Sequence, residues 1–164
     1  MAEAAKRPRP MSERQMKMIK ALMGPFSRWQ ARRYRSSQGR KMGTLQGRDI
    51  CVVTMRGART GRTRHVPLMY VPYREDSPND EGVILVASLG GAPKHPTWYY
   101  NLVAHPDIEV QVKDRRLSLR ARRASAAEKA AVWPQCVKHY PDYQSYQDRT
   151  SRDIPVFLCE PHGR

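Results

Sequence analysis

One turn in the chain has residue types that could hold an anion or a carbonyl-rich ring. An apolar run, Val83 to Ala87, leads into Ser88–Asn101, which reads SLGGAPKHPTWYYN. A strand that ends at Ser-Leu-Gly-Gly exposes backbone N–H groups that no side chain covers. Pro96 suits the first position of a helix, and Lys94 places a cation nearby. The pattern predicts a strand, a glycine turn and a helix N-terminus around a ligand, or else an ordinary turn with aromatic core residues.

A second glycine-containing turn carries positive charge. Residues 56–61 read Arg-Gly-Ala-Arg-Thr-Gly, and Arg64 follows them. Backbone N–H groups in such a turn can form an anion-binding concavity, and a guanidinium can donate two parallel hydrogen bonds to a phosphate or carboxylate. We interpret this turn as a candidate site for an anionic group. In a protein this basic, the same arginines could also be ordinary surface charge.

Three tyrosines recur every third residue at Tyr140, Tyr143 and Tyr146. On a helical turn they would share one side. Such an aromatic wall could stack a flat acceptor molecule, and a phenol could donate the proton that follows a hydride. The alternative is that the tyrosines only cap the open end of the fold. The five histidines are scattered without the spacing of metal ligands, so we expect no metal site.

Four stretches, taken in order, resemble the deazaflavin (coenzyme F420)-dependent nitroreductase and quinone reductase family of actinobacteria. The stretches are the glycine turn, residues 56–61 with Arg64 and Pro67-Leu68, Trp133-Pro134, and residues 140–147 with Arg149-Thr150 and residues 154–156. Together they span most of the chain, from about Asp49 to Pro161. The resemblance implies the split β-barrel of flavin-type oxidoreductases. It also implies reduced F420 as the hydride donor and a quinone or other electron-poor acceptor.

The resemblance also assigns residues to roles. The implied cofactor-binding residues are Ala58, Arg59, Thr60, Arg64, His65, Val66, Pro67, Leu68, Met69, Ala87, Ser88, Leu89, Gly90, Gly91, Thr97, Trp98, Tyr99, Asn101 and Tyr143. The implied acceptor-binding residues are Tyr140, Tyr143, Tyr146 and Met69, and Tyr143 and Ser88 are the implied catalytic residues. Family members that reduce bicyclic nitroimidazoles usually have tyrosine in place of Met69, and Leu89 replaces an often polar residue. We therefore expect poor nitroimidazole reduction. For Trp98 and Tyr99 the alternative is core packing.

The net charge of +15 is concentrated near the N-terminus. Residues 1–48 contain thirteen Lys/Arg and two acidic residues, and so carry +11 of it. After a capping box at Ser12, apolar residues recur at helical spacing between basic ones, and Gly24-Pro25 is expected to break or kink this helix. The apolar residues are Met16, Ile19, Leu22, Met23, Phe26 and Trp29. Such an amphipathic helix suits an anionic membrane surface, or its stripe packs on the rest of the protein.

The rest of the chain predicts an α+β fold that is mainly antiparallel β, with six short strands and few helices. We expect strands near residues 50–55, 64–71, 83–87, 108–113, 117–121 and 154–159, and helices at 98–104 and 125–140, the second interrupted by Pro134. Residues 140–152 read as irregular. The domains are then a basic arm, 1–47, and a cofactor-binding barrel, 48–164.

The cysteines and the hydropathy suggest where the protein works. Cys51, Cys136 and Cys159 are widely spaced, and the apolar neighbours of the first and third favour core thiols in a reducing cytoplasm. No stretch approaches the roughly 20 apolar residues that span a bilayer. We expect a cytoplasmic protein with peripheral contact at the inner face of the membrane.

Two other functions fit parts of the sequence. A basic barrel could bind nucleic acid, with aromatic side chains stacking on bases. However, the aromatics gather near turns instead of alternating with Lys/Arg on strands, and the charge lies outside the barrel, so no nucleic-acid partner is expected. A split barrel could also bind FMN instead of F420.

Overall fold

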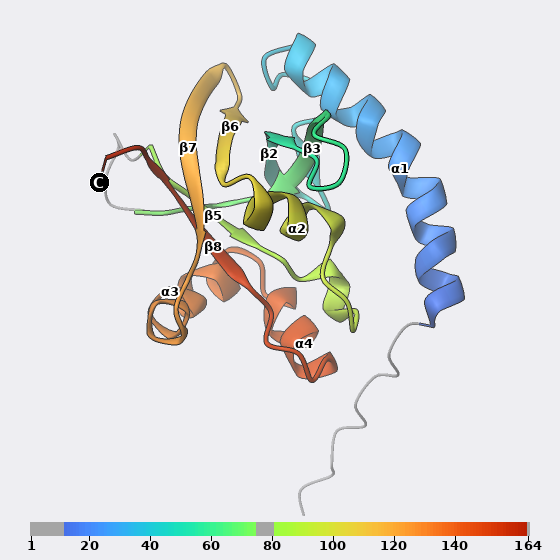
Figure 1. The fold of residues 1–164 in the computed structure, drawn as a ribbon, viewed down its shortest axis with the longest axis vertical. Helices are drawn as coiled ribbons and strands as arrows, with labels where there is room; N and C mark the ends of the chain where they lie inside the picture. Colours follow the sequence, from blue (N-terminus) through green and yellow to red (C-terminus); the bar gives the residue numbers. More distant parts are fainter. Residues whose placement is uncertain (1–11, 75–80, 164) are drawn as a thin grey trace, which may run out of the picture.

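The fold is an antiparallel sheet that curls into a half-barrel and carries helices around it (Figure 1). The computed structural model describes residues 12–74 and 81–163. Within these ranges the sheet has eight strands in the order β1–β2–β6–β7–β8–β5–β4, and β3 pairs with β2. Every pairing between them is antiparallel. The predicted α+β, mainly antiparallel fold class is therefore confirmed.

The elements follow the apolar runs and capping signals in the sequence. The strands are β1 (Thr44–Leu45), β2 (Arg48–Arg56), β3 (Thr63–Met69), β4 (Val71–Pro72), β5 (Val83–Val86), β6 (Asp107–Val112), β7 (Arg115–Arg123) and β8 (Val156–Pro161). The helices are α1 (Glu13–Ser36), the one-turn 3-10 helix η1 (Leu89–Gly91), α2 (Thr97–Ala104), α3 (Ala126–His139) and α4 (Asp142–Arg149). Capping boxes at Ser12 and Ser125 begin α1 and α3, as predicted.

Two prolines lie inside helices that the sequence predicted them to interrupt. Helix α1 continues through Gly24-Pro25 to Ser36, and α3 continues through Pro134 to His139, so the predicted break in α1 and the predicted interruption of α3 were both wrong. The kink that the sequence offered as the alternative at Gly24-Pro25 stays a prediction. Proline removes one helical N–H and leaves one carbonyl without its partner. Pro25 and Pro134 are both exposed, so water can bond that carbonyl and the helix need not end.

Residues 140–152, predicted to be irregular, contain α4. The prediction failed because apolar periodicity is weak in a helix made mostly of polar residues and tyrosine. The sheet also has two strands more than the six expected. Strands β1 and β4 have two residues each, too few for any hydrophobic alternation to indicate them.

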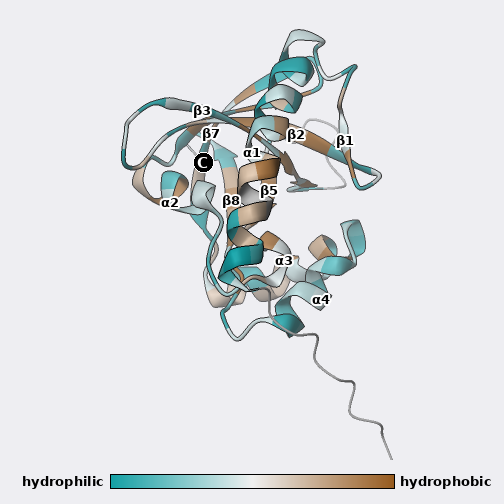
Figure 2. Ribbon diagram, turned by 90° about the vertical axis from the view of Figure 1, so that its right-hand side faces the viewer, coloured by the Kyte–Doolittle hydropathy of each residue, from teal (hydrophilic) through white to brown (hydrophobic). Residues whose placement is uncertain are grey.

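The core has three parts. The largest lies inside the curl, where side chains of β2, β5, β6, β7 and β8 pack against Trp98 and Leu102 of α2. A second part lies between the sheet and helices α3 and α4, and a third lies under α1. Figure 2 shows hydrophobic ribbon in strands β2 and β5, and also along part of α1. Cys51, Cys136 and Cys159 are all buried free thiols, as the sequence indicated for the first and third.

The C-terminal third of α1 is packed on the sheet. Ala31 and Tyr34 are 1% exposed and contact Ile50 and Val52 of β2. Gln30 is also buried, and its amide donates to the carbonyls of Met42 and Thr44. The division into an arm, 1–47, and a barrel, 48–164, stays a prediction. No helix in the described ranges is both long and apolar enough to cross a membrane.

Candidate functional site

The basic turn connects β2 to β3. Its backbone is closed by two hydrogen bonds of 2.8 Å, from Gly57 N–H to the Arg62 carbonyl and from Gly61 N–H to the Gly57 carbonyl. Gly61 has a φ of +64°, which glycine adopts without strain. Four arginines stand on this turn and its flanks, and all are exposed: Arg56, Arg59, Arg62 and Arg64. In the described part of the chain none of them pairs with a carboxylate, so their charge is available to an anionic ligand.

Asn101 of α2 holds the basic turn against the helix. Its side-chain oxygen accepts a 2.9 Å hydrogen bond from the Ala58 N–H, and its amide nitrogen lies 3.6 Å from the Met55 sulfur. Asn101 is only 8% exposed. Ala58 and Asn101, both predicted to bind cofactor, are thus brought together, and the Asn101 amide is engaged in positioning the turn.

The glycine turn follows β5 and has an unusual backbone. Leu89, Gly90 and Gly91 have φ values of +43°, +62° and +75°. A β-carbon on Gly91 would lie 2.6 Å from the Tyr146 carbonyl oxygen, so only glycine allows α4 to approach this closely. The Gly91 N–H bonds the Ser88 carbonyl, and the Ala92 N–H bonds the Leu89 carbonyl. Among the described residues, the N–H groups of Ser88, Leu89 and Gly90 have no acceptor and can bond a ligand.

Two arginines that the sequence reasoning did not assign to the site hold this turn from behind. The Arg152 guanidinium donates to the carbonyls of Ala87 (3.2 Å), Ser88 (2.7 Å) and Ala92 (2.7 Å). Arg149 donates to the Gly90 carbonyl at 3.2 Å. Arg149 is one of the residues that carry the family resemblance, and Arg152 follows Arg149 by three positions. Without the fold, nothing in the sequence connects them to a turn some sixty residues earlier.

Trp98 and Tyr99 of α2 pack against core residues, whereas Tyr100 is 51% exposed. Trp98 is 9% exposed and lies in the main core, with its ring centroid 5.9 Å from that of Phe157. Tyr99 stacks on His95 at 4.2 Å and meets the edge of Phe157 at 5.6 Å. The core-packing alternative therefore describes Trp98 in this structure. Thr97 begins the helix and is exposed.

Strand β3 carries the predicted cofactor residues from Arg64 to Met69. Val66 and Leu68 pack into the main core, whereas Met69 contacts the cores under α1 and beside α4. Tyr70 packs on the opposite side from Met69, as the alternation of side chains predicted.

His65 is held as a neutral imidazole. Its Nε2 lies 2.9 Å from the Arg35 guanidinium of α1, and its Nδ1 lies 2.9 Å from the Thr54 hydroxyl. Since a guanidinium only donates, Nε2 accepts and Nδ1 carries the proton. Burial, together with the nearby Arg35 charge, lowers the pKa of His65.

The three tyrosines gather with Met69 in one apolar cluster. Tyr140 is the C-cap residue directly after α3, while Tyr143 and Tyr146 belong to α4. The Tyr140 ring centroid lies 5.0 Å from that of Tyr143 and 6.1 Å from that of Tyr146. Met69 packs against the same cluster, so the four residues predicted to bind the acceptor lie together.

The hydroxyls of these three tyrosines differ in their hydrogen bonds. The Tyr140 hydroxyl bonds the Gln46 side chain and lies 3.1 Å from the Tyr146 hydroxyl. Tyr143 is 3% exposed, and its hydroxyl has no hydrogen-bond partner in the described ranges. Burial raises the pKa of Tyr143, so its phenol is protonated at neutral pH. Tyr143 is therefore the tyrosine of this cluster with an uncommitted proton.

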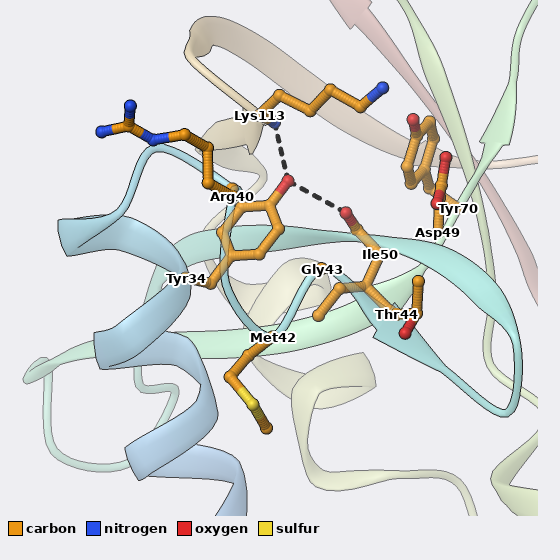
Figure 3. Close-up of a pocket in the computed structure, with 10 residues that line it drawn as sticks. Tyr34, Arg40, Met42, Gly43, Thr44, Asp49, Ile50, Tyr70 and Lys113 are labelled. Atoms are coloured by element: carbon orange, nitrogen blue, oxygen red, sulfur yellow. Dashed lines mark hydrogen bonds between the residues drawn. The ribbon is translucent and has the colours of Figure 1, made fainter.

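A cavity of about 490 Å³ lies elsewhere, between the C-terminal end of α1, the following loop and β2 (Figure 3). The Tyr34 hydroxyl stands in it, donating to the Ile50 carbonyl at 3.0 Å and accepting from the Lys113 N–H at 2.7 Å. None of the predicted site residues lines this cavity. The described residues also contain no group of three His, Cys, Asp or Glu side chains placed to hold a metal ion.

A family model and individual sequence relatives match this chain over most of its length. The model of the F420H(2)-dependent quinone reductase family matches residues 26–161. A protein of Mycobacterium tuberculosis named F420H(2)-dependent quinone reductase is 32% identical over 129 residues, which cover 76% of this chain and 83% of that protein. The range matched by the family model includes both turns and the tyrosine cluster.

Solved structures agree with the sequence matches. The structure of an F420-H2 dependent reductase, FDR-A, superposes with a TM-score of 0.59 and 42% identity, covering 68% of this chain and 93% of that one. A second structure, described as a domain-swapped dimer, superposes with a TM-score of 0.62 and 33% identity, covering 88% of this chain and 98% of that one.

Proposed function

The chain belongs to the F420H(2)-dependent quinone reductase family, and we propose that it reduces a quinone with hydride from reduced coenzyme F420. The protein is thus an oxidoreductase. One observation carries the proposal. Asn101 of α2 holds an exposed arginine-rich turn, and α2 follows a glycine turn that Arg149 and Arg152 hold and whose N–H groups at Ser88, Leu89 and Gly90 have no acceptor among the described residues.

The two turns fit the two parts of the cofactor. The F420 tail carries several negative charges, and Arg59 and Arg64 offer guanidinium groups that no carboxylate neutralises in the described ranges. The deazaflavin ring has carbonyl edges, and the N–H groups of Ser88, Leu89 and Gly90 have no acceptor among the described residues. Both parts of the site therefore have the hydrogen-bonding and charge properties that this cofactor needs.

When bound, reduced F420 supplies the hydride, and the residues of this chain orient the acceptor and supply a proton. A quinone that has received hydride carries negative charge on oxygen. A hydroxyl within hydrogen-bond reach stabilises that charge or protonates it. Tyr143 and Ser88 are suited to this role because neither hydroxyl is engaged with a described residue. In our proposal Tyr143 is the proton donor, and Ser88 positions the acceptor oxygen.

The tyrosine cluster favours a flat, apolar acceptor. Tyr140, Tyr143 and Tyr146 offer ring faces and edges, and Met69 adds an adaptable apolar contact. Met69 stands where a tyrosine would be suited to steer a nitro group, and the Arg149 guanidinium lies 5.7 Å from the centroid of the Tyr146 ring at the edge of the cluster. We therefore propose a quinone or an activated alkene as the acceptor, with poor reduction of bicyclic nitroimidazoles.

Turnover kinetics test the proposal. Purified protein should oxidise reduced F420 in the presence of a water-soluble quinone, and kcat/KM for a bicyclic nitroimidazole should be lower. Met69→Tyr should raise the nitroimidazole value relative to the quinone value. A wild-type protein that binds F420 but reduces both acceptors equally would contradict the acceptor assignment alone, whereas no quinone reduction would contradict the proposed reaction.

We further propose that α1 holds the enzyme at an anionic membrane. Leu22, Phe26 and Trp29 of the apolar stripe are 71%, 43% and 50% exposed, so this part of the stripe does not pack on the domain. Arg28 and Arg32 are exposed on a neighbouring face of the same helix. Each Lys or Arg near an anionic surface contributes about 1 kcal/mol. The combination suits a helix that lies in the plane of the interface.

Substitutions within the stripe test this without disturbing the buried end of α1. The double change Leu22→Glu and Trp29→Glu should abolish sedimentation with vesicles that contain anionic lipid. Val103→Glu is the matched control, since Val103 is 59% exposed but lies on α2. Vesicle binding that survives the double change, or that is absent in the wild type, would contradict membrane contact through α1.

A further inference from the structure

Arg152 makes an unusual number of contacts with one short segment. Its guanidinium donates to the carbonyls of Ala87, Ser88 and Ala92, and it lies 3.1 Å from Nδ1 of His95. A guanidinium has five N–H donors in a fixed plane, so it can bond several acceptors without bending. All four acceptors belong to residues 87–95, the glycine turn and the residues after it.

These contacts fix the direction of the free N–H groups. A peptide group is planar, so the carbonyl of one residue and the N–H of the next point in opposite directions. Arg152 holds the Ala87 carbonyl at 3.2 Å and the Ser88 carbonyl at 2.7 Å. The other ends of the same two peptide planes are the N–H groups of Ser88 and Leu89, which have no acceptor among the described residues.

The turn needs such support because its backbone is strained. Leu89 has a φ of +43°, in a region that a branched side chain rarely adopts. Three carbonyls held by one charged donor give the turn a fixed shape despite this strain. Without Arg152, the peptide planes on either side of Ser88 would be free to rotate.

The same residue connects the turn to the tyrosine helix. The Gln147 amide of α4 donates to the Arg152 carbonyl at 2.9 Å, and the Arg152 N–H bonds the Thr150 hydroxyl. Gln147 also accepts from the Ile154 N–H at 2.9 Å. Arg152 is thereby anchored at the end of the helix that carries Tyr143 and Tyr146.

We propose that Arg152 is a positioning residue that orients the Ser88 and Leu89 N–H groups toward the deazaflavin ring and holds that turn in register with the tyrosine cluster. This inference rests on the proposed function. It assigns Arg152 no contact with the cofactor or the acceptor. A lysine in its place would keep the charge, but its single ammonium could not hold three carbonyls in one plane.

Arg152→Ala and Arg152→Lys test the inference, with Arg120→Ala as the matched control. Arg120 is exposed on β7, and its ion pair within the described ranges is with Asp107 at the surface. The dissociation constant of F420 is measured by fluorescence titration in buffer without urea. Urea unfolding curves first show that every variant is folded in that buffer. Amide hydrogen exchange at Gly91 and Ala92, whose bonds close the turn, reports the turn in the protein without cofactor.

Both Arg152 variants should bind F420 about tenfold more weakly, because charged hydrogen bonds that orient the turn are lost. Exchange at Gly91 and Ala92 should accelerate. Millimolar guanidinium should restore binding to Arg152→Ala and leave Arg120→Ala unchanged. Wild-type affinity in folded Arg152→Ala would overturn the inference and leave the proposed function intact. If the wild type bound no F420, the proposed function and this inference would fall together.

Discussion

The two turns of the candidate site are built in opposite ways. The basic turn presents exposed arginines, and a single buried residue, Asn101, ties it to α2. The glycine turn presents no charge, has three consecutive positive φ values, and is held by Arg149 and Arg152 through four carbonyls. The basic turn supplies positive charge on side chains that are free to move, whereas the glycine turn supplies N–H groups in fixed directions from a strained backbone.

This difference suggests how each turn should respond to change. Attraction between exposed charges is screened by salt and declines gradually when one arginine is removed. A strained backbone held by partly buried hydrogen bonds loses its shape when one contact fails. We therefore expect large, salt-independent effects at the glycine turn and small, salt-dependent effects at the basic turn.

The largest effect is expected from adding one methyl group to each turn. At Gly91 a new β-carbon would meet the Tyr146 carbonyl oxygen at 2.6 Å, in addition to strain from a φ of +75°. At Gly61 the nearest atom would be the end of the Arg56 side chain at 3.8 Å, and only the φ of +64° is unfavourable. Gly91→Ala should lower the unfolding free energy by about 3 kcal/mol or more, and Gly61→Ala by about 1 kcal/mol. Urea unfolding measures both, and equal losses would contradict the contrast.

Removal of one hydroxyl tests the acceptor side next to the glycine turn. Tyr143→Phe keeps the ring and its packing but removes the uncommitted proton. Quinone turnover should fall by about 10²-fold, with little change in F420 affinity. Tyr146→Phe is the control, because the Tyr146 hydroxyl is already paired with Tyr140. If Tyr143→Phe turned over as fast as the wild type, the proton would come from elsewhere.

Single arginine substitutions probe the basic turn. Arg59→Ala and Arg64→Ala should each weaken F420 binding by about fivefold at low salt, and by less at high salt. By contrast, the loss caused by Arg152→Ala should change little with salt, because its partners are backbone carbonyls. Titrations at two salt concentrations make the comparison. A steep salt dependence for Arg152→Ala would remove the distinction between the turns.

The smallest effect concerns two histidines that support the site. Burial, followed by nearby arginines, lowers the pKa of His65 and of His95 below the ordinary value of 6.5. Above that pH both are neutral in the folded and unfolded states. As the pH falls below it, the unfolded chain binds protons first, so the unfolding free energy should decline. Urea midpoints at about pH 7.5 and 5.5 measure the decline, and His65→Gln should reduce it. If the unfolding free energy of His65→Gln declined between these pH values as much as that of the wild type, His65 would be excluded as a contributor.

The sequence was informative where a local signal determines local structure. Both capping boxes, the strand before the glycine turn and the helix after it were predicted near their observed positions. The spacing of the tyrosines also predicted their association, although Tyr140 caps the end of α3 and the other two lie on α4. The burial of Cys51 and Cys159 was predicted from their apolar neighbours in the same way.

Long-range contacts could not be predicted in this way. Arg152 and the glycine turn are about sixty residues apart, and the pairing of β5 with β8, together with the packing of α4 on the turn, brings them together. Asn101 was predicted to bind cofactor, but no sequence pattern indicates that its amide is bonded to Ala58. Helix α1 can continue through Pro25 because this residue faces water. The packing of Ala31 and Tyr34 on β2 determines which side of α1 faces water, and this packing is not visible in the sequence.

The central claim, that the two turns together form an F420 site, is tested most directly by side-by-side binding titrations with F420, FMN and single-stranded DNA. FMN has a single phosphate and lacks the extended anionic tail for which the basic turn is suited. Our account predicts that F420 binds much more tightly than FMN and that DNA does not compete with it. FMN binding equal to or tighter than that of F420, or displacement of F420 by DNA, would contradict the account.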